Sequence, residues 1–180
     1  TIQNRELIFL AEGNRNDHFI AGFDMNYAWD FYAKTKTIWN GENAANLFTT
    51  NTSEYTNIPS GKHKIRFTTN HDESAWDATP ITLFNGKNGA LAASVATIFM
   101  NGVPLFYSGQ EVGRLNTVSF FNSTPIDWTT NPDMLLAYQN MMTFYKNSNA
   151  SKKGSLIAFP SNDILCFQKV HNSENILIII

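Results

Sequence analysis

The sequence predicts an α/β fold in which a parallel sheet is followed by a short antiparallel region. Over the first five-sixths of the 180 residues, apolar runs that suit strands alternate with segments that suit helices, which is typical of parallel α/β proteins. After Ser148 the pattern changes to three short apolar runs separated by turns, which indicates antiparallel hairpins. Polar residues also gather directly after successive predicted strands. In barrels of parallel strands and helices, the active site lies at this end of the strands.

The composition is that of a globular chain that can bury a core, with 43% hydrophobic and 13% aromatic residues. A formal net charge of −2 gives no electrostatic footprint for nucleic acid, so we exclude a nucleic-acid partner. No apolar run approaches the roughly 20 residues of a membrane span, so no transmembrane segment is expected. The Cys and His residues show no metal-ligand spacing, so no metal site is predicted. Because the chain starts at Thr1 and stops inside an apolar run, we expect a fragment of a longer protein.

The first predicted strand covers residues 5–11, and it ends at Glu12. Its apolar run does not alternate with polar residues, which suits a strand covered on both faces. Residues 19–32 begin as a short strand and turn into an aromatic, helix-like segment. Residues 40–46 read as a loop that opens a helix.

A turn at residues 59–61 precedes the next predicted strand, residues 64–69. This strand runs directly into Asn70, His71, Asp72 and Glu73. Four such polar side chains are costly to bury unless they are paired or used. We therefore expect the strand to end there, with its tip lining a polar pocket.

The third section repeats the pattern of helix, strand and polar tip. A turn at residues 86–89 leads to residues 90–100, which are apolar nearly all round and therefore predict a buried helix. Residues 103–107 form a short buried strand that is followed by the polar residues 108–111.

The α/β region ends with an irregular segment, residues 115–133, and a helix over residues 134–146. Apolar residues recur in that helix at spacings of three and four. The tail then holds the three short strands LIAFP, ILCFQKV and NILIII.

Several of these segments resemble, in order, parts of the α-amylase family of glycoside hydrolases. FLAEG is similar to the fifth barrel strand of that family, FDMNYAWDFY to the sixth, IRFTTNHD to the seventh and VPLFYSGQEVG to the eighth, while SFFNSTPIDW resembles the closing turn. The resemblance covers nearly the whole chain. It implies the C-terminal half of a TIM (β/α)₈ barrel, strands 5–8 within residues 1–149, followed by the beginning of an antiparallel β domain over residues 150–180.

The family's nucleophile, an aspartate in a G-x-R-x-D segment of the fourth strand, has no counterpart in this chain. Its third-strand motif is absent too. The resemblance therefore implies that strands one to four lie upstream of Thr1, and that these 180 residues are inactive when isolated.

The resemblance assigns catalytic roles to Glu12 and Asp72. Glu12 would be the general acid/base of a retaining glycosidase, and Asp72 the third carboxylate, which hydrogen-bonds the sugar and favours its distorted ring. The structural alternatives are a strand-ending surface carboxylate for Glu12 and a cap on the following segment for His71 and Asp72.

Three further residues are assigned to substrate binding. His71 would hydrogen-bond the same sugar as Asp72. Asn70 belongs to the same tripeptide, although bracing of the strand end is its more plausible role. Trp76 is our choice among the Trp residues for an aromatic platform under a sugar ring, since it follows the polar tip; most aromatic residues, however, belong to the core.

Together these assignments predict part of a retaining α-glycosidase that acts on starch-like α-glucans. Another member of the family is the alternative, namely an α-glucosidase, a debranching enzyme or a glucanotransferase, and a non-catalytic glycan-binding relative is a third. No cofactor is expected within the fragment, although family members often bind Ca²⁺, which the full-length protein could hold. Polymeric starch would favour an extracellular, periplasmic or cell-surface location. We also expect the fragment to self-associate through exposed strand edges.

Overall fold

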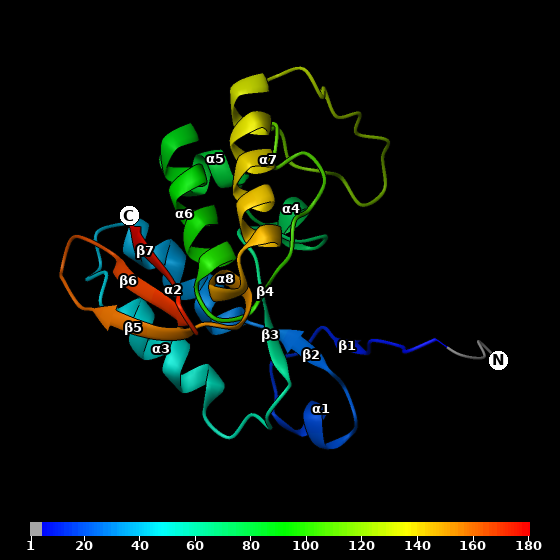
Figure 1. The fold of residues 1–180 in the computed structure, drawn as a ribbon. Coiled ribbons are helices and arrows are strands. Elements are labelled where there is room, and N and C mark those ends of the chain that lie inside the picture. Colours follow the sequence, from blue (N-terminus) through cyan, green and yellow to red (C-terminus); the bar gives the residue numbers. More distant parts are fainter. Residues whose placement is uncertain (1–4) are drawn as a thin grey trace.

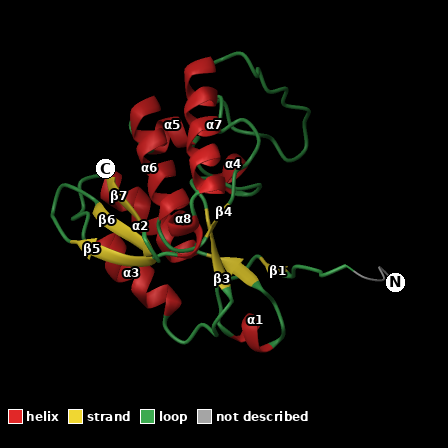
Figure 2. Ribbon diagram, in the orientation of Figure 1, coloured by secondary structure: helices red, strands yellow, loops and turns green. Residues whose placement is uncertain are grey.

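A computed structural model of the chain describes residues 5–180, which form two sheets with helices packed around them (Figures 1 and 2). The first sheet is parallel, and its four strands lie in chain order. Parallel strands in chain order, joined by helical connections, are the arrangement of part of a (β/α)₈ barrel. Residues 1–4 of the predicted first domain lie outside the described residues. The strands are β1 (Leu10–Ala11), β2 (Met25–Tyr27), β3 (His63–Arg66) and β4 (Val103–Pro104).

The strands are shorter than the sequence predicts, most clearly at the start of the chain. Of the strand predicted over residues 5–11, only Leu10 and Ala11 pair, and they pair with β2. Among the described residues β1 has a neighbour on one side only. Its apolar side chains are also uncovered, with Phe9 53% and Leu10 41% exposed, so the expected burial of this strand on both faces is wrong. Ile8, for example, is 71% exposed. An open apolar edge of this kind favours association, and self-association through it stays a prediction.

Helices connect the strands and supply most of the core. The predicted apolar helix is confirmed in α6, where Ala90, Ala93, Ala96 and Ile98 have no exposed surface. Burial on every side is not, because Leu91, Ala92 and Val95 are only partly buried. None of the described helices is both long and apolar enough to cross a membrane. The helices are α1 (Asp17–Ile20), α2 (Trp29–Trp39), α3 (Asn46–Tyr55), α4 (Glu73–Trp76), α5 (Pro80–Leu83), α6 (Lys87–Phe99), α7 (Pro132–Asn147) and α8 (Asn149–Lys153).

The predicted start of a strand at Phe19 is wrong. Phe19 and Ile20 lie in the short helix α1, and the strand begins at Met25. Phe19 is buried and lies 5.8 Å below the Lys64 ammonium, so a tertiary contact decides the position of this aromatic residue.

The turn predicted over residues 86–89 is also shorter than expected. Gly86 forms it with a φ of 99°, a conformation that favours glycine, and α6 begins at the next residue. Gly89 is helical, and glycine is required there for a different reason. A Cβ at this position would come within 1.5 Å of the Phe84 carbonyl oxygen, so the missing side chain allows α6 to pack against the preceding segment.

The antiparallel tail is confirmed as two consecutive hairpins with the strand order β5-β6-β7. One face of this sheet packs on the main core, since Phe167 and Ile178 lie in one cluster with Phe48 and Ile98. The strands are β5 (Ser155–Phe159), β6 (Cys166–His171) and β7 (Glu174–Ile179).

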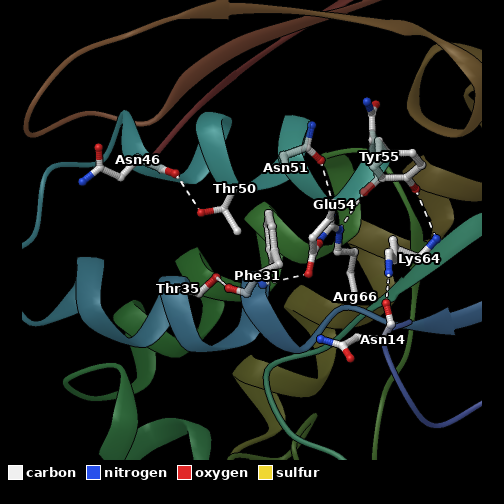
Figure 3. A network of polar contacts seen from close by, with 11 residues as sticks. Asn14, Phe31, Thr35, Asn46, Thr50, Asn51, Glu54, Tyr55, Lys64 and Arg66 are labelled. Carbon is white, nitrogen blue, oxygen red and sulfur yellow. Dashed lines mark hydrogen bonds and ion pairs between the residues drawn. The ribbon is translucent and has the colours of Figure 1, made fainter. Parts of the chain in front are cut away.

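A buried charged network ties β3 to the helices behind it (Figure 3). The Arg66 side chain has no exposed surface, and its guanidinium pairs with the Glu54 carboxylate of α3. It also donates to Asn51 Oδ1 and to the Asn101 carbonyl, both at 2.8 Å, and stacks 3.9 Å from the centre of the Phe31 ring. Glu54 in turn accepts the backbone N–H of Phe31. The network therefore joins β3, α2, α3 and the segment after α6.

A second buried cation connects β6 to the segment after α6. Lys169 of β6 is 2% exposed, and its Nζ donates to Asn101 Oδ1 at 2.8 Å. Burial lowers the pKa of Lys169 from 10.5 to about 8. A neutral amide does not offset the cost of holding an ammonium away from water.

Lys169 therefore predicts a pH-dependent stability. Between about pH 8 and 10.5 the folded chain has released this proton while the unfolded chain still holds it, so the free energy of unfolding rises with pH. We expect Lys169→Met to be more stable than the native chain near neutral pH, by about 2–3 kcal/mol. The difference should shrink above about pH 8, which urea unfolding of both proteins across this pH range would measure. If the difference in the free energy of unfolding between the two proteins stays constant with pH, Lys169 does not have the lowered pKa on which this prediction rests.

Candidate active site

The candidate site lies at the carboxyl edge of the parallel sheet. Glu12 directly follows β1, and His71 and Asp72 follow the buried end of the β3 segment. Because β1, β2 and β3 are parallel neighbours, their carboxyl ends meet at one edge although they are far apart in the sequence.

The structure brings Glu12, His71 and Asp72 together. His71 Nε2 lies 2.9 Å from Glu12 Oε1 and 3.7 Å from Asp72 Oδ1. The three side chains are between 43% and 64% exposed, so they line an open surface that a ligand can reach. Two carboxyl groups beside one imidazole can exchange protons with a ligand and accept hydrogen bonds from its hydroxyl groups.

Asn70 lies beneath this group and holds the backbone. It has no exposed surface, and its Oδ1 accepts the N–H groups of Asp72 at 3.0 Å and Glu73 at 2.9 Å. It therefore performs the capping of α4 that the structural alternative assigned to Asp72. Asp72 stands at the N-cap position, but its carboxylate makes no capping hydrogen bond there. That carboxylate is 43% exposed and stays accessible to a ligand.

Asn70 predicts a local stability effect. We expect Asn70→Ala to lower the free energy of unfolding by about 1–2 kcal/mol, because two N–H groups at the start of α4 lose their acceptor. Asn116→Ala, in an exposed loop, is the matched control and should stay within about 0.5 kcal/mol of the native chain. Urea unfolding measures both, and equal effects would contradict this role for Asn70.

The neighbouring strand β2 and the start of α2 supply two residues that the sequence did not assign to the site. Tyr27, at the end of β2, is buried, and its pKa is raised by burial and by the charges of Glu12 and Asp72. Trp29 donates its indole N–H to the Glu12 carbonyl at 2.8 Å and so fixes the backbone of the candidate acid. Strand order alone could have indicated Tyr27, since the end of β2 must lie between those of β1 and β3.

Trp76 lies at the last position of α4 and is 74% exposed. Its ring meets that of Phe120, with 5.2 Å between the ring centres. It is therefore a surface aromatic residue on the segment that carries Asp72.

Among residues 5–180, no group of three or more His, Cys, Asp or Glu side chains is arranged to hold a metal ion. The Ca²⁺ expected for the full-length protein stays a prediction.

No family model matches the chain, and no curated protein matches its sequence. Its fold, however, matches many solved structures. A noncanonic maltogenic α-amylase from Thermotoga neapolitana superposes with a TM-score of 0.84 at 19% identity, over 98% of this chain and 42% of that one. A cyclic α-maltosyl-(1→6)-maltose hydrolase from Arthrobacter globiformis gives 0.81 at 20%, over 99% and 42%. A debranching enzyme from Nostoc punctiforme gives 0.80 at 16%, over 98% and 42%.

These neighbours are α-amylase-family glycoside hydrolases, and the chain spans about two fifths of their length. At this level of identity the likeness establishes the fold. The predicted fold class is thereby confirmed as part of a (β/α)₈ barrel followed by the beginning of an antiparallel β domain.

Proposed function

We propose that this chain is the acid/base-bearing half of a retaining α-glycosidase of the α-amylase family, acting on α-glucans. The observation that carries the proposal is the convergence of Glu12 and Asp72 on one nitrogen of His71 at the carboxyl edge of the sheet. A strand-ending surface carboxylate would not require this partner, which follows a strand two positions away in the sheet.

The proposed substrate class has support from the neighbours. The Arthrobacter hydrolase has been solved in complexes with maltose and with its cyclic maltosyl-maltose, and the Nostoc enzyme was soaked with acarbose. For this chain we propose an α-linked glucan, with starch-like chains as the preferred form.

In the proposed mechanism, Glu12 protonates the oxygen of the departing sugar and later takes a proton from the attacking water. Asp72 and His71 form hydrogen bonds with the hydroxyl groups of the sugar at the cleavage point. Asn70 and Trp29 hold the backbones of these residues in place. We assign the nucleophilic carboxylate, which a retaining enzyme needs about 5–5.5 Å from the acid, to a segment outside these 180 residues.

The proposal is tested first in the parent gene. We expect a G-x-R-x-D segment shortly upstream of Thr1, and a substituted aspartate in that segment would overturn the enzymatic assignment in favour of a glycan-binding relative. Product analysis of the complete enzyme on amylose, pullulan and maltose would then separate α-amylase action from that of an α-glucosidase, a debranching enzyme or a glucanotransferase.

We expect the purified 180-residue chain to release no reducing sugar from amylose. The reason is that one carboxyl group of the required pair is missing, so no glycosyl-enzyme intermediate can form. A reducing-sugar assay measures this, with a complete α-amylase at equal concentration as the positive control. Turnover by the isolated chain would refute the assignment of the nucleophile to a segment outside these 180 residues.

A further inference from the structure

Three exposed aromatic side chains form a continuous ridge beside the candidate site. We call Trp76, Phe120 and Phe121 the aromatic ridge. Their exposed fractions are 74%, 44% and 94%, and the ring centres are 5.2 Å apart from Trp76 to Phe120 and 6.2 Å apart from Phe120 to Phe121. Large aromatic side chains are seldom left in water as a group unless the surface binds something.

The ridge belongs to the two segments that follow the neighbouring strands β3 and β4. Trp76 comes from the segment after β3, and the two Phe residues come from the long irregular segment after β4, which extends past α4 before α7 begins (Figure 1). The two segments are joined directly, because the N–H of Val118 donates to the carbonyl of Ser74 at 2.8 Å. The ridge is therefore anchored to α4, which follows Asp72 and ends at Trp76.

The loop that carries the Phe residues is held by its own hydrogen bonds. Ser119 Oγ accepts the N–H groups of Phe121 and Asn122, each at 3.2 Å, and the N–H of Ser119 donates to Thr124 Oγ1 at 3.2 Å. This turn presents Phe120 and Phe121 side by side on the surface. A ligand would thus find the rings largely preorganised.

We propose that the aromatic ridge binds the units of an α-glucan that extend beyond the cleavage point, and so makes the site selective for long chains. This inference rests on the proposed function. A pyranose ring presents C–H groups on its faces, which pack on the faces of aromatic rings, and successive units can each use one ring of the ridge. Trp76 ends the helix whose N-cap position is Asp72, so the ridge is continuous with the candidate site, and this continuity favours a glucan over a protein partner or a second copy of the chain.

The test measures the affinity of the complete enzyme for maltoheptaose and for maltose by isothermal titration calorimetry, with Glu12→Gln present in every protein so that the sugars are not cleaved. Phe120→Ala and Phe121→Ala should each weaken maltoheptaose binding by about two- to tenfold and leave maltose binding unchanged. Phe121→Trp should retain the affinity for maltoheptaose. Phe159→Ala is the matched control, because Phe159 is an exposed Phe (45%) on the distant strand β5.

The possible outcomes separate the two proposals. If the complete enzyme binds both sugars and the Phe variants bind them equally well, the ridge is overturned and the proposed function stands. If the complete enzyme binds neither sugar, both proposals are overturned. If the Phe variants change the sedimentation coefficient and leave glucan affinity unaltered, the ridge is a protein contact and the inference is wrong.

Discussion

Glu12→Gln is expected to lower the turnover of the complete enzyme by about 10²- to 10⁴-fold, the usual contribution of general acid/base catalysis. Glutamine has the shape of glutamate and can keep its contact with His71, which lies 2.9 Å from the carboxylate in the native structure. It cannot deliver a proton to the departing sugar or take one from water. The loss should therefore fall on kcat, while the affinity for maltoheptaose survives.

Two comparisons make this expectation specific. The first is Glu6→Gln, an exposed glutamate on the same N-terminal segment, which should retain full turnover. The second uses a substrate whose departing group is a stabilised phenolate. Such a group needs no proton, so the loss of turnover should be confined to the later hydrolysis step, in which Glu12 activates water. Asp72→Asn should be similarly damaging with both substrates, because its proposed role is to hold the distorted ring. Near-native turnover of Glu12→Gln would remove Glu12 from the site.

The pattern of the sequence was enough to predict that Glu12 and Asp72 lie close together, whereas their catalytic roles stay a prediction. Glu12 and Asp72 each follow a predicted strand, and parallel strands bring their carboxyl ends to one edge whatever the length of the connection. The capping role of Asn70 depends on residues two and three positions away, so it is a local feature that amide-rich turns commonly show.

Features that depend on distant neighbours were not predictable in the same way. The length of β1 depends on which strand lies beside it, and only Leu10 and Ala11 find one. Gly89 looked like a turn residue because its sequence neighbours suggest one, whereas its actual role is set by the Phe84 carbonyl. Phe19 suited a strand by propensity, yet its burial beneath Lys64 places it in a helix.

The buried network around Arg66 was also invisible in the sequence, because strand position and charge say nothing of a partner on α3. Arg66→Met is expected to lower the free energy of unfolding by about 3–5 kcal/mol, since the Glu54 carboxylate stays buried without its cation. Glu54→Leu should cost a similar amount for the converse reason, since Arg66 then stays buried without its anion. Either loss is a large fraction of the roughly 5–15 kcal/mol that holds a domain folded, so urea unfolding should be followed at low temperature.

The double variant Glu54→Leu/Arg66→Met decides whether the cost comes from the unpaired charge or from lost packing. If the charge dominates, removing both partners should cost less than the sum of the two single losses, because no ion then stays buried alone. A remainder of about 1–3 kcal/mol is still expected, since Asn51 and the Asn101 carbonyl lose the donors that Arg66 supplied. Lys87→Met, which breaks the exposed Lys87–Asp133 pair, is the surface control and should cost less than about 1 kcal/mol. Strictly additive losses in the double variant would show that Arg66 and Glu54 stabilise the sheet independently, and that the ion pair between them contributes nothing of its own.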